Sequence, residues 1–296
     1  MKKFKARRRK NHKLLKIIIV FIVLLFCFTK FSSFLTKTHF SSYLFGNFAK
    51  KRINDVEFLL KYAINLEYNP VSKEVISIEN NSTKDEYYEP LVYIYNTHQK
   101  EEYQNSFLET YNIKSNVLIA SYILKENLAN NNINAIVETS DLVAIRNNMN
   151  LKYGKSYYIS RIKMEEAFNN NQTLKYFIDL HRDSGSYEKT TLIVGNTSYA
   201  KILFVIGLDN PTYQSNLDLA NNLNNLINSK VANLSRGVLK KSGKNVNGIY
   251  NQDFNKNVLL IEVGGENNTI SEVSNTLEIL AMVISEYIKG EENYDL

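Results

Sequence analysis

From residue 89 onward, short apolar segments alternate with amphipathic ones, and this alternation constrains the fold more than any other feature. The segments typical of strands are 91–95, 134–138, 175–180, 191–194, 202–207 and 258–263. Helical spacing of apolar residues appears over 116–128, 157–168, 215–230 and from Ile270 to Ile288. This order predicts an α/β layered fold with a mostly parallel sheet flanked by helices. Because about 200 residues suffice for one core, we expect one domain over 89–290 and a tail at 291–296.

A second feature, near the N-terminus, predicts a membrane anchor. Residues 17–29 read IIIVFIVLLFCFT without a charge, and the segment 17–37 approaches the roughly 20 residues that cross a bilayer. The nine basic residues before it favour a cytoplasmic tail at 1–16 and an extracytoplasmic domain. Residues 38–88 between the anchor and the domain are expected to form a juxtamembrane stalk and linker. The predicted location is therefore the cell membrane, with a single span preceding the α/β domain. The alternative is a cleaved secretory signal, but no small-residue cleavage site follows.

The basic tail also explains the net charge of +6. Of 36 Lys and Arg residues, nine lie in the tail, so 27 remain against 30 acidic residues. This balance gives no reason to expect nucleic-acid binding by the folded part. The single cysteine, Cys27, lies inside the apolar run, which excludes an internal disulfide framework and a thiolate zinc cluster. Any metal site must use histidine and carboxylate.

Two histidines follow apolar strands directly. His98 ends the segment VYIYNTH, and His181 ends KYFIDLH. Because the carboxyl ends of parallel strands meet at one edge of a sheet, both imidazoles are expected there. Acidic residues accompany both histidines: Glu101, Glu102, Asp179 and Asp183. From these residues alone, a metal site and ordinary structural roles both remain open, and Asp179 shares a strand face with His181 by the two-residue period.

Glu262 is the most unusual acid of the chain. It follows four apolar residues and precedes Val263 and two glycines in VLLIEVGG, so it is expected to lie partly buried at a strand end. Burial raises the pKa of a carboxyl toward the range useful to a general base; the alternative is a carboxylate that caps a neighbouring loop. A zinc hydrolase needs three ligands, an open position and a separate base. Serine nucleophile elbows, P-loops and dinucleotide-binding glycine motifs are absent from the sequence.

Six segments occur in the order found in the stage II sporulation protein P family: YIYNTHQKEEY, YFIDLHRDS, FVIGLDNPTYQSNLDLANNL, LSRGV, YNQDF and LLIEVGGENNT. The chain resembles that family over roughly 89–290. The resemblance implies an amidase-type α/β fold and an N-acetylmuramoyl-L-alanine amidase that uses zinc to cleave the amide between muramic acid and the stem peptide of peptidoglycan. It also implies a second, endopeptidase activity on peptide cross-links, and a role in spore engulfment with the stage II sporulation proteins D and M.

The resemblance further implies roles for individual residues. His98 matches the second histidine of the family's His-Thr-His block, and His181 matches the histidine of its Ile-Asp-x-His-Arg-Asp block, so both are implied zinc ligands. Glu101, three residues after the first ligand, is the implied third ligand. Glu262, before Gly-Gly in the last strand, is the implied catalytic base. Other acids remain open as the third ligand: Glu102, Glu109 and Asp183.

The chain departs from the family pattern at Asn96, where the first histidine of the His-Thr-His block is expected. This change predicts altered tuning around the metal rather than its loss, and it leaves open a weakly active, peptidoglycan-binding scaffold that recruits a partner hydrolase. An amidase of ordinary cell separation is a further alternative. Substrate contacts are expected from Arg182, Asp183, Arg236 and Asn251, although an ion pair between structural residues or solvated loop roles explain them equally well. Ser235 and Gln252 are weaker candidates of the same kind.

Overall fold

The computed structural model of the protein describes residues 89–104 and 114–294. The predicted tail at 1–16, the anchor at 17–37 and the stalk and linker at 38–88 lie outside the described residues. None of the helices in the described ranges combines the length and the apolar character that a membrane span requires.

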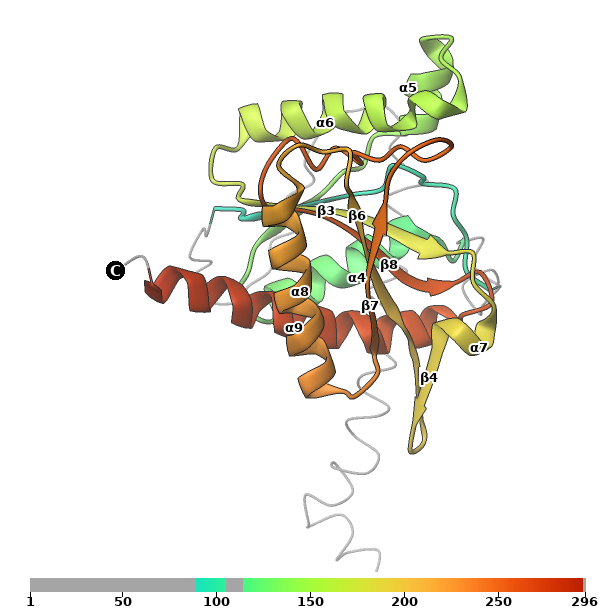
Figure 1. The fold of residues 1–296 in the computed structure, drawn as a ribbon, viewed down its shortest axis with the longest axis vertical. Helices are drawn as coiled ribbons and strands as arrows, with labels where there is room; N and C mark the ends of the chain where they lie inside the picture. The colour runs from blue at the N-terminus through green and yellow to red at the C-terminus, as the bar shows by residue number, and fades with distance from the viewer. Residues whose placement is uncertain (1–88, 105–113, 295–296) are drawn as a thin grey trace, which may run out of the picture. The chain divides into compact units, whose positions relative to one another are not determined.

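A six-stranded sheet forms the centre of the domain (Figure 1), in the order β2-β1-β3-β8-β6-β7. The strands are β1 (Val92–Tyr95), β2 (Ala135–Val137), β3 (Tyr176–Asp183), β6 (Ile202–Gly207), β7 (Ser235–Lys241) and β8 (Val258–Gly265). Neighbouring strands are parallel except for β6 and β8, which pair antiparallel. The prediction of a mostly parallel sheet is therefore confirmed.

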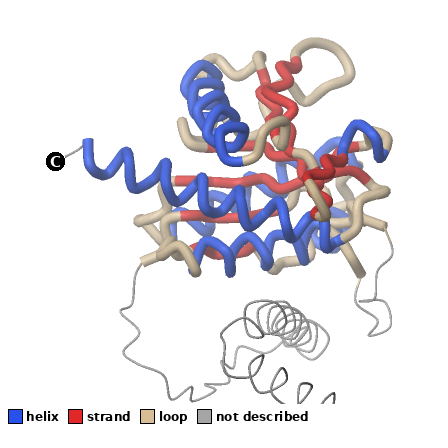
Figure 2. Tube along the Cα trace, turned by 90° about the horizontal axis from the view of Figure 1, so that it is seen from below, coloured by secondary structure: helices blue, strands red, loops and turns tan. Residues whose placement is uncertain are grey.

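Helices cover both faces of this sheet. They are α4 (Val117–Ala129), α5 (Leu142–Asn148), α6 (Ser156–Asn170), α7 (Tyr187–Thr190), α8 (Tyr213–Lys230) and α9 (Ile270–Tyr294), with a 3-10 helix, η3 (Tyr153–Lys155), before α6. Figure 1 shows α6 and α9 on opposite sides of the sheet. In Figure 2, α9 runs toward the C-terminus beside a second helix across the strands, consistent with the packing of α4 against α9.

The buried faces of these elements follow from their sequence patterns. The predicted apolar positions of α9 are all buried: Ile270, Val273, Leu277, Leu280, Ile284 and Ile288. Helix α4 begins where the side chain of Asn116 accepts a hydrogen bond from the backbone N of Ile119 at 3.1 Å, which satisfies one of the free N–H groups of the first turn. On the α6 face, Tyr93 and Phe177 pack with Met164. This core fixes β1 and β3 under α6.

Three features differ from the expectations. Strand β3 extends three residues beyond the predicted 175–180, so His181 lies within the strand rather than after it. Strand β8 extends two residues beyond the predicted 258–263, so Glu262 lies inside the strand rather than at its end. The segment 191–194 is a strand, β4, but it pairs only with β5 (Thr197–Ala200) in a separate hairpin. Strand β7 was not predicted, because it lies at the sheet edge, half-exposed, and its sequence SRGVLKK lacks a buried apolar run.

Candidate active site

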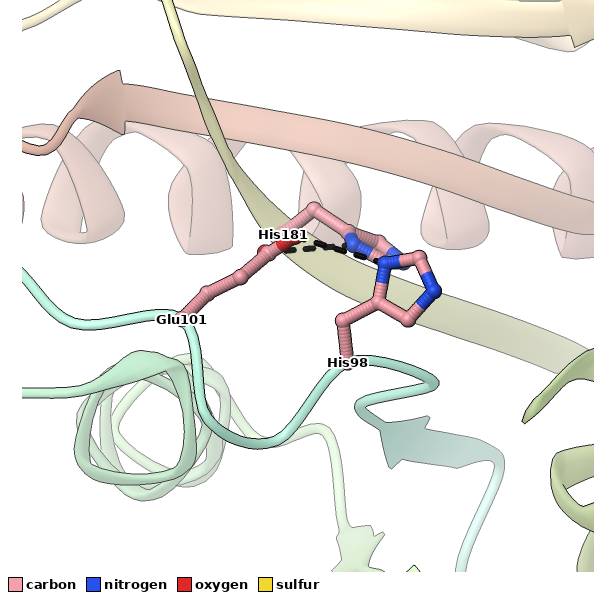
Figure 3. Close-up of side chains that lie close together, drawn as sticks. All are labelled: His98, Glu101 and His181. Atoms are coloured by element: carbon pink, nitrogen blue, oxygen red, sulfur yellow. Dashed lines mark ion pairs between the residues drawn. The ribbon is translucent and has the colours of Figure 1, made fainter. Parts of the chain in front are cut away.

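The turn after β1 and the end of β3 bring His98, Glu101 and His181 together (Figure 3). The Nδ1 atom of His98 lies 3.4 Å from one carboxylate oxygen of Glu101, and the Nδ1 atom of His181 lies 3.2 Å from the other. One potential ligand atom from each of the three side chains lies within 4.8 Å of the others. Two imidazoles and a carboxylate in this arrangement can hold a divalent transition metal.

A backbone hydrogen bond explains why Glu101 rather than Glu102 faces the imidazoles. The backbone N of Glu101 donates to the carbonyl of His98 at 3.0 Å, so the chain turns and returns the third residue to the side of the first. Glu102 points elsewhere: it is exposed, and its carboxylate pairs with Lys114 at 2.6 Å. Glu109 lies outside the described residues.

Asp179 supports His181 from behind. It is fully buried on β3, and its Oδ1 atom lies 2.9 Å from Nε2 of His181. The backbone N and the hydroxyl of Thr97 donate to the same carboxylate at 2.9 and 2.7 Å. The predicted shared strand face is therefore observed. The contact between Nε2 and Asp179 is an ion-pair contact rather than a hydrogen bond, and Nδ1 of His181 is the atom that lies toward Glu101.

The surroundings shift the pKa values of two cluster members in opposite directions. Burial opposes ionisation of Glu101, but hydrogen bonds from His181, His98 and the backbone N of Arg182 lower its pKa to about 2. Burial likewise opposes a charged His181, but the negative charges of Asp179 and Glu101 raise its pKa well above the usual value. Without a metal, positive charge on His181 is held between two carboxylates. The cluster is thus built around a cation.

Glu262 lies beside this cluster on the next strand. It is the register partner of His181 in the parallel pair β3–β8, and paired residues of adjacent strands point to the same face. Burial raises the pKa of Glu262 to about 7, helped by the negative charges of Glu101 and Asp183 and opposed by the positive charge of His181. Its Oε2 atom is buried and has no hydrogen-bond partner among the described residues. This carboxyl can therefore take up or release a proton near neutral pH.

An aromatic wall lies on the other side of His98. The ring of Tyr153 stacks on His98 with centroids 5.1 Å apart, and Tyr157 meets the same imidazole edge-on at 5.7 Å. A cavity of about 320 Å³ opens beside His98 and Glu101, lined also by Arg146. Sequence patterns do not indicate Tyr153 and Arg146 as site residues, because η3 and α5 are too short to show helical periodicity.

Asn96, the departure from the family pattern, directly follows β1. It is fully buried. Its amide donates to the carbonyl of Leu180 at 2.6 Å, and its oxygen accepts from the hydroxyl of Ser121 at 3.1 Å. These contacts join β1 to β3 and α4. Asn96 therefore has a structural role, and none of these partners is a side chain of the cluster.

Of the four residues predicted to contact substrate, only Arg182 lines the cavity, and the other three are held by contacts within the domain. Arg182 lines the cavity, but its Nε donates to the carbonyl of Glu102 at 2.8 Å. The carboxylate of Asp183 forms an ion pair with Arg236 of β7. Asn251 is buried, and its amide donates to the Tyr157 carbonyl at 2.9 Å. Asn251 therefore anchors α6.

The two weaker candidates are also held by internal contacts. Gln252 is fully buried, with its amide between the backbone groups of Val205 and Gly207. Ser235 is buried at the start of β7, where its backbone N donates to Asn228 at 2.9 Å. Both positions serve the packing of β6 and β7.

Comparison with known proteins gives a family match. The model of the family Stage II sporulation protein P (SpoIIP) matches residues 49–285. Stage II sporulation protein P of Bacillus subtilis (strain 168) is 33% identical over 202 residues, which cover 66% of this chain and 50% of that protein. The chain thus spans about half the length of the curated relative that it matches.

Two solved structures show a weaker likeness. The CwlD amidase from Clostridioides difficile, in complex with the GerS lipoprotein, is 13% identical with a TM-score of 0.43, covering 67% of this chain and 98% of that one. Cwp6 from Clostridium difficile is 13% identical with a TM-score of 0.38, covering 68% and 29%. At these scores neither structure enters the argument about function.

Proposed function

Because the chain belongs to the stage II sporulation protein P family, we propose that it is a zinc-dependent peptidoglycan hydrolase of sporulation. The bond cleaved is the amide between N-acetylmuramic acid and the stem peptide. One observation supports the proposal above the others: a His–Glu–His cluster and a half-buried glutamate of raised pKa share one edge of the sheet.

The residues of the cluster fit zinc chemically. Zinc in hydrolases is bound by imidazole nitrogen and carboxylate oxygen, with one position left for water or substrate. His98, Glu101 and His181 supply these donors, and Asp179 stands behind one imidazole as a supporting carboxylate. When bound, zinc would supply a Lewis acid for the amide carbonyl and lower the pKa of water.

Glu262 is the residue that moves the proton. Its unpartnered Oε2 takes a proton from the attacking water as the new C–O bond forms. The same oxygen then gives the proton to the leaving amine nitrogen as the C–N bond breaks, so no net proton is consumed on the enzyme. A pKa of about 7 suits both steps, because the group exchanges protons readily near neutral pH.

The alternative of a weakly active, peptidoglycan-binding scaffold rests on Asn96. Since Asn96 bonds to Leu180 and Ser121 rather than to the cluster, its presence gives no reason to expect a damaged metal site. Several expectations from the sequence stay predictions. They are a vegetative role, endopeptidase activity, partnership with the sporulation proteins D and M, the anchor at 17–37 and the extracytoplasmic location.

The direct test is product analysis. The full chain, purified in detergent with one equivalent of zinc, is incubated with purified peptidoglycan, and the soluble products are identified by mass spectrometry. We expect intact stem peptides with a free N-terminal alanine amine, and about 10²- to 10⁴-fold less of them from Glu262→Gln. Products that retain muramic acid on the peptide, or no products, would contradict the proposal.

A further inference from the structure

The cavity beside His98 and Glu101 carries more positive than negative charge. Its lining includes three basic side chains and one acidic side chain, Glu101. The basic residues are Lys100, Arg146 and Arg182. Glu101 faces the two imidazoles and Arg182 lies 3.8 Å from the carboxylate of Glu266, so Lys100 and Arg146 are the basic residues of this lining that have no ion pair among the described residues. An anionic group is the ligand that this lining favours.

Arg146, in the last turn of α5, is positioned but lacks an anionic partner. Its Nη1 and Nη2 donate to the side-chain oxygens of Ser156 and Asn147, both at 3.2 Å. Its Nε is buried without a hydrogen-bond partner among the described residues. No carboxylate of the described ranges lies within ion-pair distance of this guanidinium. A half-buried arginine held only by neutral oxygens retains its capacity for a bidentate contact with a carboxylate.

A second arginine of the same domain, Arg161, has the acidic partners that Arg146 lacks. Arg161 on α6 donates to Glu165 at 2.8 Å and to Asp253 at 2.9 Å, and its guanidinium lies 4.8 Å from the ring centre of Phe254. Arg146 likewise lies over an aromatic ring, Tyr153, at 5.4 Å. The two arginines therefore differ mainly in their acidic partners, which Arg146 lacks.

Tyr153 connects Arg146 to the cluster. The same ring contacts the guanidinium of Arg146 and stacks on the imidazole of His98 at 5.1 Å. It is 64% exposed, so a substrate can lie along it. An anion bound by Arg146 would thus be separated from His98 of the cluster by the ring of Tyr153.

We propose that Arg146, assisted by Lys100, binds a free carboxylate of the stem peptide and makes the protein selective for it. This inference rests on the proposed function, whose site it extends. The chemistry of the substrate selects the peptide rather than the glycan. The lactyl carboxyl of muramic acid is consumed in the scissile amide, and the N-acetylated sugars are otherwise neutral. The nearest free carboxylate is the α-carboxylate of a γ-linked D-glutamate at the second peptide position.

The test uses two muropeptides that differ only in this group, one with D-glutamate and one with its amide, D-isoglutamine. The zinc-loaded full chain should prefer D-glutamate by about 10- to 100-fold in kcat/KM, mainly through KM, since a charge-assisted contact is lost in the amide. Arg146→Gln should abolish the preference, and Arg146→Lys should restore part of it. Arg161→Gln is the matched control and should keep the preference in full.

A second readout does not depend on catalysis. Calorimetry on the chelator-treated full chain measures binding of the product peptide L-alanyl-γ-D-glutamyl-L-lysine and of the same peptide with the glutamate α-carboxylate amidated. We expect the wild type to bind the free acid about 10- to 100-fold more tightly, and Arg146→Gln to bind both equally. If wild type shows no hydrolysis of either muropeptide but this binding pattern holds, the proposed function fails and the carboxylate site stands.

Two outcomes would overturn the inference itself. The first is a wild-type chain that does not distinguish acid from amide in binding or in KM. The second is an Arg146→Gln variant, or an Arg146→Lys variant should the former not fold, that keeps the complete preference or loses no more of it than Arg161→Gln does.

Discussion

The turn after β1 and strand β8 each place a glutamate beside the same pair of imidazoles, but in opposite environments. Glu101 receives hydrogen bonds from His98, His181 and a backbone N–H, which lower its pKa to about 2. Glu262 follows the buried apolar run of β8, has an unpartnered oxygen, and has a pKa of about 7. Two identical side chains thus suit different tasks: a permanently ionised ligand and a proton carrier.

The comparison shows that the backbone, rather than the residue type, decides which role each glutamate takes. A turn exposes Glu101 to several donors, whereas a parallel strand places Glu262 among apolar neighbours and beside one imidazole. The same side chain is stabilised as a carboxylate in one place and as an acid in the other. Substitutions of the two glutamates and of the residue that supports His181 test these different roles, and the largest expected effect comes first.

Removal of Glu101 should cost the metal itself. The Glu101→Ala chain is expected to lose most of its tightly bound zinc, together with activity on peptidoglycan, because a three-donor site becomes a two-donor site. Zinc content after gel filtration is the measurement. The neighbouring Glu102→Ala is the matched control, since that exposed carboxylate pairs with Lys114 instead. Equal zinc content in the two variants would remove Glu101 from the metal site.

Glu262→Gln should separate chemistry from metal binding. The amide keeps the shape of the side chain but cannot accept the proton of water, so we expect about 10²- to 10⁴-fold less peptide release. Zinc content should stay at the wild-type level, because Glu262 is not one of the three clustered donors. Activity within a few fold of wild type would show that another group moves the proton.

The raised pKa of Glu262 also predicts a pH dependence of stability in the metal-free protein. Between about pH 4.5 and pH 7 the folded chain keeps a proton on Glu262 that the unfolded chain releases, so stability falls as the pH rises through this window. Glu262→Gln should abolish this loss and be more stable than wild type at pH 8 by about 3 kcal/mol.

Denaturant unfolding in detergent with chelator, at pH 5 and pH 8, measures this difference. The variant should approach wild-type stability at pH 5 and exceed it at pH 8. Parallel stability curves for the two chains would mean that Glu262 ionises as easily in the folded as in the unfolded state.

The smallest expected effect is on zinc affinity, when Asp179 behind His181 is replaced. Asp179→Asn keeps a buried polar group of the same size but removes the negative charge that orients the imidazole. Zinc affinity, measured by competition with a chelating dye, should fall about 10- to 100-fold. Asp253→Asn, an exposed acid paired with Arg161, serves as the control. No difference between these variants would leave Asp179 with a purely structural role.

The sequence predicts the part of the molecule that is most buried. Strands β1, β3 and β8 lie inside the sheet and therefore form continuous apolar runs. Their ends carry or precede His98, His181 and Glu262, so the meeting of these residues at one edge follows from the parallel order. The antiparallel pairing of β6 with β8 carries no sequence signal of this kind, because pairing direction depends on the connections.

Sequence patterns cannot predict which acidic residue faces the two histidines, nor which side chains line the cavity beside them. The hydrogen bond from the N–H of Glu101 to the carbonyl of His98 turns Glu101 rather than Glu102 toward the imidazoles, and no sequence pattern announces that turn, although the family resemblance favours the same residue. Arg146 and Tyr153 come from a seven-residue helix and a three-residue 3-10 turn. Elements this short bury too few apolar side chains to leave a periodic pattern.

The central claim is that His98, Glu101 and His181 hold a zinc ion beside Glu262. Crystals of the full chain grown with zinc, measured on both sides of the zinc absorption edge, test it most directly. We predict one strong anomalous peak about 2.0–2.2 Å from one ligand atom of each of these three side chains, and none within bonding distance of Glu262. A peak that lacks any of the three ligands, or fully zinc-loaded protein with the peak elsewhere, would contradict the account.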